Sequence, residues 1–139
     1  MKRRIKHVTV LGSGIMGSGI AAHFANIGVE VLLLDIVPFE LTEAEQKKGL
    51  TKEDKAVRNR IATESLAKLV KASPALLYKK EFAERISVGN FDDDLQKIKN
   101  TDWIIEVVVE RLDIKKSVYE KIEQFRKPGT LVSSNTSGI

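Results

Sequence analysis

Three glycines and one aspartate have the spacing of a nucleotide-binding site. Gly12, Gly14 and Gly17 lie between two apolar runs, and the second run ends at Asp35. The first glycine would let the chain turn tightly out of a strand, the second would leave room for a pyrophosphate against the backbone, and the third would let a helix pack close to the sheet. The two phosphates would lie at the positive end of that helix.

The acid predicts which dinucleotide fits. Asp35 follows the glycines by about 20 residues, where a carboxylate can accept both hydroxyls of an adenosine ribose. Neither Arg nor Lys occurs over residues 36–38 to hold a 2′-phosphate. The sequence therefore predicts NAD rather than NADP as the cofactor.

The apolar pattern around the glycines predicts a strand, a helix and a second strand. The strands cover residues 8–11 and 31–34, and their uninterrupted apolar runs are typical of buried parallel strands. The helix runs from Ile15 to about Asn26 and ends at Gly28. Further strands are expected over residues 85–88, 103–109 and 130–133, with a helix from Asp113 to about Lys127.

These elements predict an α/β fold, a Rossmann-type doubly wound parallel sheet. Five strands joined by right-handed crossovers take the order 3-2-1-4-5, and ligands bind at the carboxyl ends of the strands between strands 1 and 4. The glycine loop, Glu110 and residues 135–137 all fall on that edge. Strand 5 is expected to be an open edge of the sheet.

A long helical excursion separates the second and third strands. Thr51 and Asp54 resemble a capping box, which predicts a helix continuing to about Lys71. Ser73 and Pro74 have the pattern of an N-cap and first position, which predicts another helix ending at Phe82. An excursion of this length often carries function.

Two charged stretches allow more than one interpretation. Residues 47–80 carry ten lysines and arginines against three acids, an excess of seven positive charges. This excess is either a solvated helix face or a site for a small polyanion. The run Asp92-Asp93-Asp94 could suggest a metal site, but we expect it to cap a short helix and complement its dipole.

Composition excludes several classes of protein. The chain has 139 residues with 42% hydrophobic composition, enough for one core. It has no cysteine, which excludes disulfides and cysteine-ligated metals. No apolar run approaches the roughly 20 residues that span a bilayer, and no motif for nucleic acid is present. A signal peptide is disfavoured because four glycines over residues 12–19 make a poor apolar helix. We expect a cytoplasmic protein.

Three separated motifs together resemble a known family. The stretch G-S-G-I-M-G-S-G-I-A with Asp35, the stretch I-I-E-V-V-V-E-R-L-D-I-K-K and the terminal S-S-N-T-S resemble the amino-terminal domain of L-3-hydroxyacyl-CoA dehydrogenases of fatty-acid β-oxidation. The resemblance covers nearly the whole chain and is greatest to the large bacterial members. It implies hydride transfer from the 3-hydroxyl carbon of an acyl-CoA to NAD.

The resemblance also implies roles for individual residues. Ser137 would touch both the cofactor and the substrate 3-oxygen, Ser65 would contact coenzyme A, and either Lys68 or Lys71 would accompany it. Without the resemblance, Glu110 and Lys115 would be interpreted as an ordinary surface pair. The implied cofactor contacts are Gly12, Ser13, Gly14, Ile15, Met16, Gly17, Asp35, Val108, Val109, Glu110, Lys115 and Ser137.

The family's general base is a histidine oriented by a glutamate, and both lie beyond the strand that would follow Ser137. His7 and His23 are the only histidines here, and we expect both to be structural or exposed. Residues 1–139 are therefore expected to be the truncated NAD-binding part of a dehydrogenase whose carboxy-terminal helical domain forms a homo-oligomer. The alternatives are another two-domain NAD-dependent hydroxyacid or sugar-nucleotide dehydrogenase, or a non-catalytic NAD-binding module.

Overall fold

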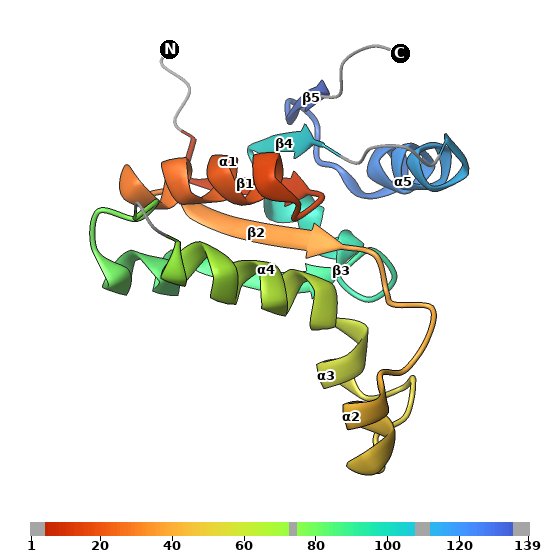
Figure 1. Cartoon of the computed structure of the whole chain (residues 1–139). Coiled ribbons are helices and arrows are strands. Elements are labelled where there is room, and N and C mark those ends of the chain that lie inside the picture. Colours follow the sequence, from red (N-terminus) through yellow and green to blue (C-terminus); the bar gives the residue numbers. More distant parts are fainter. Residues whose placement is uncertain (1–4, 73–74, 108–111, 135–139) are drawn as a thin grey trace.

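A five-stranded parallel sheet forms the centre of the molecule (Figure 1). The structure, a computed structural model, describes residues 5–72, 75–107 and 112–134. The sheet order is β3-β2-β1-β4-β5, which confirms the predicted Rossmann-type topology. The strands are β1 (His7–Leu11), β2 (Glu30–Asp35), β3 (Ile86–Asn90), β4 (Trp103–Glu106) and β5 (Leu131–Ser134).

Helices cover both faces of the sheet because its side chains alternate between them. Val8 and Val10 of β1 belong to the cluster under α1 (Ile15–Asn26), α4 (Arg60–Lys71) and the short 3₁₀ helix η1 (Lys80–Arg85). Leu11 of the same strand packs with the 3₁₀ helix η2 (Leu95–Asn100) and α5 (Leu112–Phe125) on the other face. The observed bounds of α1 match the predicted ones. No helix in the described ranges has both the length and the apolar character needed to cross a bilayer.

The excursion begins differently from the prediction. Figure 1 shows two short helices, α2 (Glu43–Lys47) and α3 (Lys55–Arg58), that stand away from the sheet beyond the start of α4. The reciprocal capping box belongs to α2, because Thr42 accepts from the Glu45 N–H and the Glu45 carboxylate accepts from the Thr42 N–H. That backbone bond, together with the Arg60 guanidinium, lowers the pKa of Glu45.

The predicted helix from Thr51 is wrong in its start and in its continuity. Asp54 accepts from the Thr51 N–H at 2.7 Å, but the Thr51 hydroxyl accepts from Glu53, so the box is incomplete and α3 starts only at Lys55. The helical region then breaks at Asn59, whose side chain accepts from Asn90 at 2.6 Å. The sequence pattern favours a continuous helix here, but the tertiary contact between Asn59 and the end of β3 interrupts it.

The helix predicted to end at Phe82 is also wrong. Residues 73–74 lie outside the described part of the chain, residues 75–79 are irregular, and η1 occupies residues 80–85. The cause is Asn26, which donates to the Leu76 carbonyl and accepts from the Tyr78 N–H, both at 2.9 Å. These bonds hold the backbone polar groups that a helix would need for itself.

Candidate nucleotide-binding site

The loop between β1 and α1 has two positions that only glycine can occupy. Gly12 has φ +110°, and a Cβ atom there would lie 3.1 Å from the Val107 carbonyl group. A Cβ atom on Gly17 would lie 1.8 Å from the Gly12 carbonyl oxygen. The tight turn and the close packing of the helix, both predicted from the spacing, are therefore confirmed by the geometry.

The amino end of α1 is open where phosphates are expected. Gly14 is the N-cap residue, and a Cβ atom added there would meet nothing within 4 Å. Ile15 is 97% exposed and Met16 is 55% exposed. The helix has 12 residues, so its first N–H groups and its dipole favour an anion at this end.

Asp35 lies directly against this loop. Its Oδ2 atom accepts from the Ser13 N–H at 2.8 Å and from the Ser13 hydroxyl at 2.6 Å, and its Oδ1 atom accepts from the Ile36 N–H at 2.7 Å. A carboxylate has about four acceptor directions. The two bonds to Ser13 use both directions on Oδ2, whereas Oδ1 keeps one for a further donor such as a ribose hydroxyl.

Two of the three coenzyme A candidates share a cavity with the loop. The cavity has a volume of about 260 Å³ and is lined by Ser13, Gly14, Ile15, Ser18, Ser65, Lys68, Leu69 and Leu76. The Ser65 hydroxyl oxygen lies 2.9 Å from that of Ser13. Lys71 does not line this cavity, so the structure distinguishes it from Lys68.

The remaining predicted contacts are described incompletely. Val108, Val109, Glu110 and Ser137 lie outside the described residues. Lys115 falls within α5, but its side chain lies outside the description.

Both histidines are exposed, and each lies at the end of its strand or helix that is farther from the glycine loop. His7 begins β1 at the opposite edge of the sheet, 4.0 Å from the Asp102 carboxylate. His23 is in the last turn of α1, with its ring edge-on to Phe24. These positions agree with the structural or exposed roles expected from the sequence.

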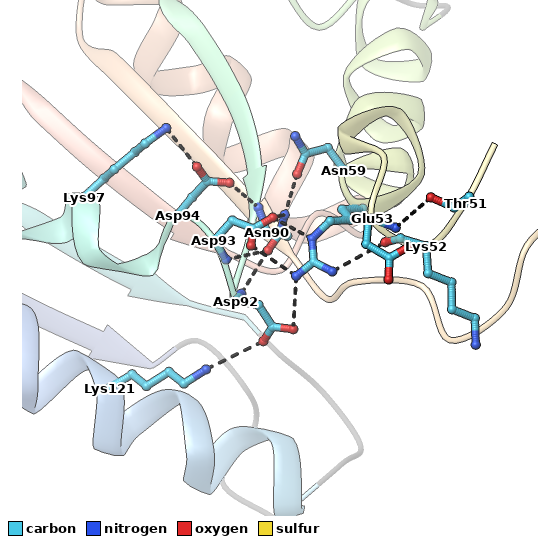
Figure 2. A network of polar contacts seen from close by, with 11 residues as sticks. Thr51, Lys52, Glu53, Asn59, Asn90, Asp92, Asp93, Asp94, Lys97 and Lys121 are labelled. Atoms are coloured by element: carbon cyan, nitrogen blue, oxygen red, sulfur yellow. Dashed lines mark hydrogen bonds and ion pairs between the residues drawn. The ribbon is translucent and has the colours of Figure 1, made fainter.

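Figure 2 shows the acidic turn, residues 92–94, which follows β3. The Arg58 guanidinium donates to both carboxylate oxygens of Asp93, at 2.7 and 3.1 Å. Asp92 lies 3.8 Å from Arg58 and 3.6 Å from Lys121 of α5. The hydrogen bond from Arg58 lowers the pKa of Asp93, and the bond from Asn90 adds to this effect. The bond between Arg58 and Asp93 also raises the pKa of Arg58.

The predicted capping role of the three aspartates is wrong. Asp94 occupies the N-cap position of η2, but its side chain makes no capping bond. Its carboxylate instead accepts from the Asn90 N–H at 2.9 Å and pairs with Lys97 at 2.8 Å. Among the described residues, no group of three or more His, Asp or Glu side chains is placed to hold a metal ion.

Asn90 is the centre of this network and was not singled out from the sequence. It is 1% exposed, donates to Asn59 and Asp93, and accepts from the N–H groups of Asp92 and Asp93. The network joins the acidic turn to the start of α4. Arg58 and Asp93 are separated by 35 residues, so no local pattern indicates their pairing.

The basic excess of the excursion is partly neutralised. Arg58 pairs with the acidic turn, and Arg60 pairs with Glu45, so both partners lie outside residues 47–80. Lys68, in contrast to these two arginines, lines the cavity beside the glycine loop. The structure therefore shows paired cations in one part of the segment and places Lys68 beside the cavity.

A buried carboxylate on the other face of the sheet was also missed. Glu106, the last residue of β4, is 0% exposed, and the Tyr119 hydroxyl of α5 donates to its Oε1 atom at 3.0 Å. In the sequence this glutamate is one position in an apolar run. Its burial follows from the alternation of side chains along β4, which directs it under α5.

Known proteins share both the sequence and the fold. A probable 3-hydroxyacyl-CoA dehydrogenase of Bacillus subtilis is 54% identical over 139 residues, all of this chain and 18% of that protein. One of Deinococcus radiodurans is 41% identical over 136 residues, 98% of this chain and 35% of that protein. The crystal structure of (S)-3-hydroxybutyryl-CoA dehydrogenase PaaH1 from Ralstonia eutropha superposes with a TM-score of 0.62 at 28% identity, covering 98% of this chain and 42% of that one.

The chain thus spans less than half the length of each of these relatives. The family described as "3-hydroxyacyl-CoA dehydrogenase, NAD binding domain" matches residues 7–139, which include every described part of the nucleotide site. The glycine loop, Asp35 and the sheet order agree with that match. The chain therefore belongs to the family of NAD-binding domains of 3-hydroxyacyl-CoA dehydrogenases.

Proposed function

We propose that the protein carrying this chain oxidises 3-hydroxyacyl-CoA to 3-ketoacyl-CoA with NAD, as a step of fatty-acid oxidation. The observation that carries the proposal is the placement of Asp35 against the glycine loop by Ser13, in a chain of this family. When bound, NAD accepts the hydride from carbon 3 of the substrate, while the hydroxyl proton passes to a base.

The chain's own residues would bind and orient the adenosine half of the cofactor. The open N-terminus of α1 would hold the pyrophosphate, and Ile15 and Met16 would cover it. Asp35 Oδ1 would accept a ribose hydroxyl, since it retains an acceptor direction. For the nicotinamide half we propose Val108, Val109, Glu110 and Lys115, with Ser137 placing the substrate oxygen.

We assign Ser65 and Lys68 to the adenosine end of coenzyme A, with Lys71 as a weaker contributor. The support is the cavity that both residues line and the cationic charge at its rim. Charge reversal at Lys68 should raise the KM for acyl-CoA, and the same change at Lys71 should have a smaller effect. Both effects should weaken with salt, because exposed charges are screened within about 8 Å at physiological ionic strength.

The whole protein would act in the cytoplasm, and its further length would supply the general base and the oligomer contacts. Residues 1–139 alone would then bind NAD without turnover, because general-base catalysis typically contributes about 10²–10⁴-fold. The test is NADH formation from 3-hydroxybutyryl-CoA by the intact protein and by residues 1–139. Turnover by the short chain within a few-fold of the intact protein would show that His7 or His23 is catalytic.

Replacement of Asp35 tests the cofactor assignment. The Asp35 carboxylate would repel a 2′-phosphate, so the intact protein should prefer NAD to NADP. Asp35→Ala should lower NAD affinity by about tenfold, the loss expected for charge-assisted bonds, and should narrow the gap between the two cofactors. Calorimetry that finds equal or tighter NADP binding by the unmodified protein would contradict the assignment.

A further inference from the structure

The Ser13 hydroxyl lies between the ribose-binding acid and helix α4. Its oxygen is 2.6 Å from Asp35 Oδ2 and 2.9 Å from the Ser65 hydroxyl oxygen. A serine hydroxyl carries one proton, and an ionised carboxylate carries none. The Ser13 hydroxyl is the donor in both contacts, so its one proton is shared between them, and the bond to the carboxylate is the shorter because it is charge-assisted. The Ser65 oxygen accepts in its contact with Ser13.

We propose that Ser65 is a positioning residue of the NAD site, because its hydroxyl fixes that of Ser13 on the Asp35 carboxylate. The backbone of Ser13 is already held, since its N–H group bonds the same carboxylate and the residue is 2% exposed. The remaining freedom is rotation of the Ser13 hydroxyl, which Ser65 limits. The proposal rests on the proposed role of Asp35 in NAD binding and extends the role of Ser65 beyond coenzyme A.

This arrangement also determines what Ser65 offers to the cavity. Because the Ser65 oxygen accepts from Ser13, its own proton remains available for an acceptor in the cavity. A phosphate or carbonyl oxygen of a ligand is such an acceptor. The ammonium group of Lys68, which lines the same cavity, is a second donor to phosphate oxygens.

Helix α4 has anchors that do not depend on this hydroxyl. Ala62 is 1% exposed and Leu69 is 2% exposed, the latter in the core under the sheet. At the start of the helix, Asn59 bonds Asn90 of β3. Removal of the Ser65 hydroxyl should therefore leave the helix in place, so an effect on NAD would report positioning and not unfolding.

The test is NAD affinity of the intact protein by calorimetry, in Ser65→Ala, Ser13→Ala and the double variant. Ser65→Ala should weaken NAD binding about three- to tenfold, the range for one hydrogen bond. The double variant should bind no worse than Ser13→Ala alone, because the two hydroxyls act through one path. Ser65→Thr, which keeps the hydroxyl, should restore affinity. Thr63→Ala, an exposed hydroxyl on the same helix, is the matched control and should leave NAD affinity and Tm unchanged.

The outcomes separate this inference from the proposed function. Unchanged NAD affinity in Ser65→Ala with a raised KM for acyl-CoA would overturn the inference and leave the dehydrogenase assignment standing. Additive losses in the double variant would also overturn it. An intact protein that binds NAD with the predicted coupling, yet does not oxidise 3-hydroxyacyl-CoA, would overturn the proposed function alone.

Discussion

An aspartate accepts hydrogen bonds from backbone N–H groups at each of two edges of the sheet, the carboxyl edge where the strands end and the amino edge where they begin. The two carboxylates differ in their other neighbours. At the carboxyl edge, Asp35 bonds the N–H groups of Ser13 and Ile36 and lies beside the cavity that Ser13 lines. At the amino edge, Asp102 bonds the N–H groups of Lys6 and His7 and the Lys127 ammonium group. The first carboxylate therefore lies beside a cavity that a ligand can enter, whereas the second joins three segments of the protein itself.

The difference shows that a carboxylate bonded to backbone N–H groups can either lie at a ligand site or stabilise the fold. Burial raises the pKa of Asp102, but the bonds from Lys6, Lys127 and His7 outweigh it and lower that pKa to about 2. The carboxylate therefore stabilises the junction of β1, β4 and β5. Changes at the carboxyl edge should alter NAD binding, and changes at the amino edge should alter stability alone.

The largest effect should come from Gly17→Ala, which breaks the carboxyl edge. The added Cβ atom would lie 1.8 Å from the Gly12 carbonyl oxygen, so the backbone must shift. We expect a loss of about 3 kcal/mol in the free energy of unfolding and a fall in NAD affinity of at least about tenfold. Denaturant unfolding and calorimetry measure the two quantities.

Gly19→Ala is the matched control for that prediction. A Cβ atom on Gly19 would meet nothing within 4 Å, and the residue lies inside α1. Alanine should stabilise the helix by about 0.5–1 kcal/mol and leave NAD affinity unchanged. Equal behaviour of the two variants would mean that the close contact at Gly17 is unimportant.

A smaller effect is expected at Asn90, which supports the carboxyl edge without facing the cavity. Asn90→Ala would leave the N–H groups of Asp92 and Asp93 without their acceptor. The free energy of unfolding should fall by about 2 kcal/mol, with a change in NAD affinity below about threefold. Asn100→Ala, at an exposed position, should stay within about 0.5 kcal/mol of the unmodified protein. A similar loss of unfolding free energy in both variants would mean that the hydrogen bonds of Asn90 do not stabilise the fold.

The smallest effect should follow Asp102→Asn, which breaks the amino edge. The folded pKa of about 2 lies below the ordinary 3.8, so the carboxylate stabilises the fold above about pH 4 and loses that effect as the pH falls toward 2. We expect Asp102→Asn to cost about 1–2 kcal/mol at pH 7 and to leave NAD affinity intact.

The pH dependence sharpens this comparison. The difference in unfolding free energy between the unmodified protein and Asp102→Asn should shrink as the pH falls from 4 to 2. Glu30→Gln removes an exposed carboxylate from the same edge and is the matched control for the loss of one negative charge at pH 7. A gap that persists at pH 2 would mean that Asp102 acts through shape and not through charge.

The sequence by itself determined the sheet and the loop. Alternating and continuous apolar runs depend on neighbours along the chain, and they predicted the five strands and the bounds of α1. Gly12 and Gly17 were predicted correctly because the backbone geometry of the loop admits no side chain. Asp35 was predicted from its distance along the chain, since the end of β2 must lie next to the end of β1 in this topology.

Only the tertiary structure decided how the excursion meets this site. Hydrogen bonds connect it to the sheet and the glycine loop. Arg58 bonds Asp93 across 35 residues, Asn59 bonds Asn90 across 31, and Ser65 bonds Ser13 across 52. Such pairs depend on where a helix docks on the sheet, and the same side chains would be ordinary solvated groups on a helix docked elsewhere. Local hydrogen-bonding and apolar patterns carry no information on that docking, which is why the break at Asn59 and the place of Ser65 beside the glycine loop emerge only once the helices are packed.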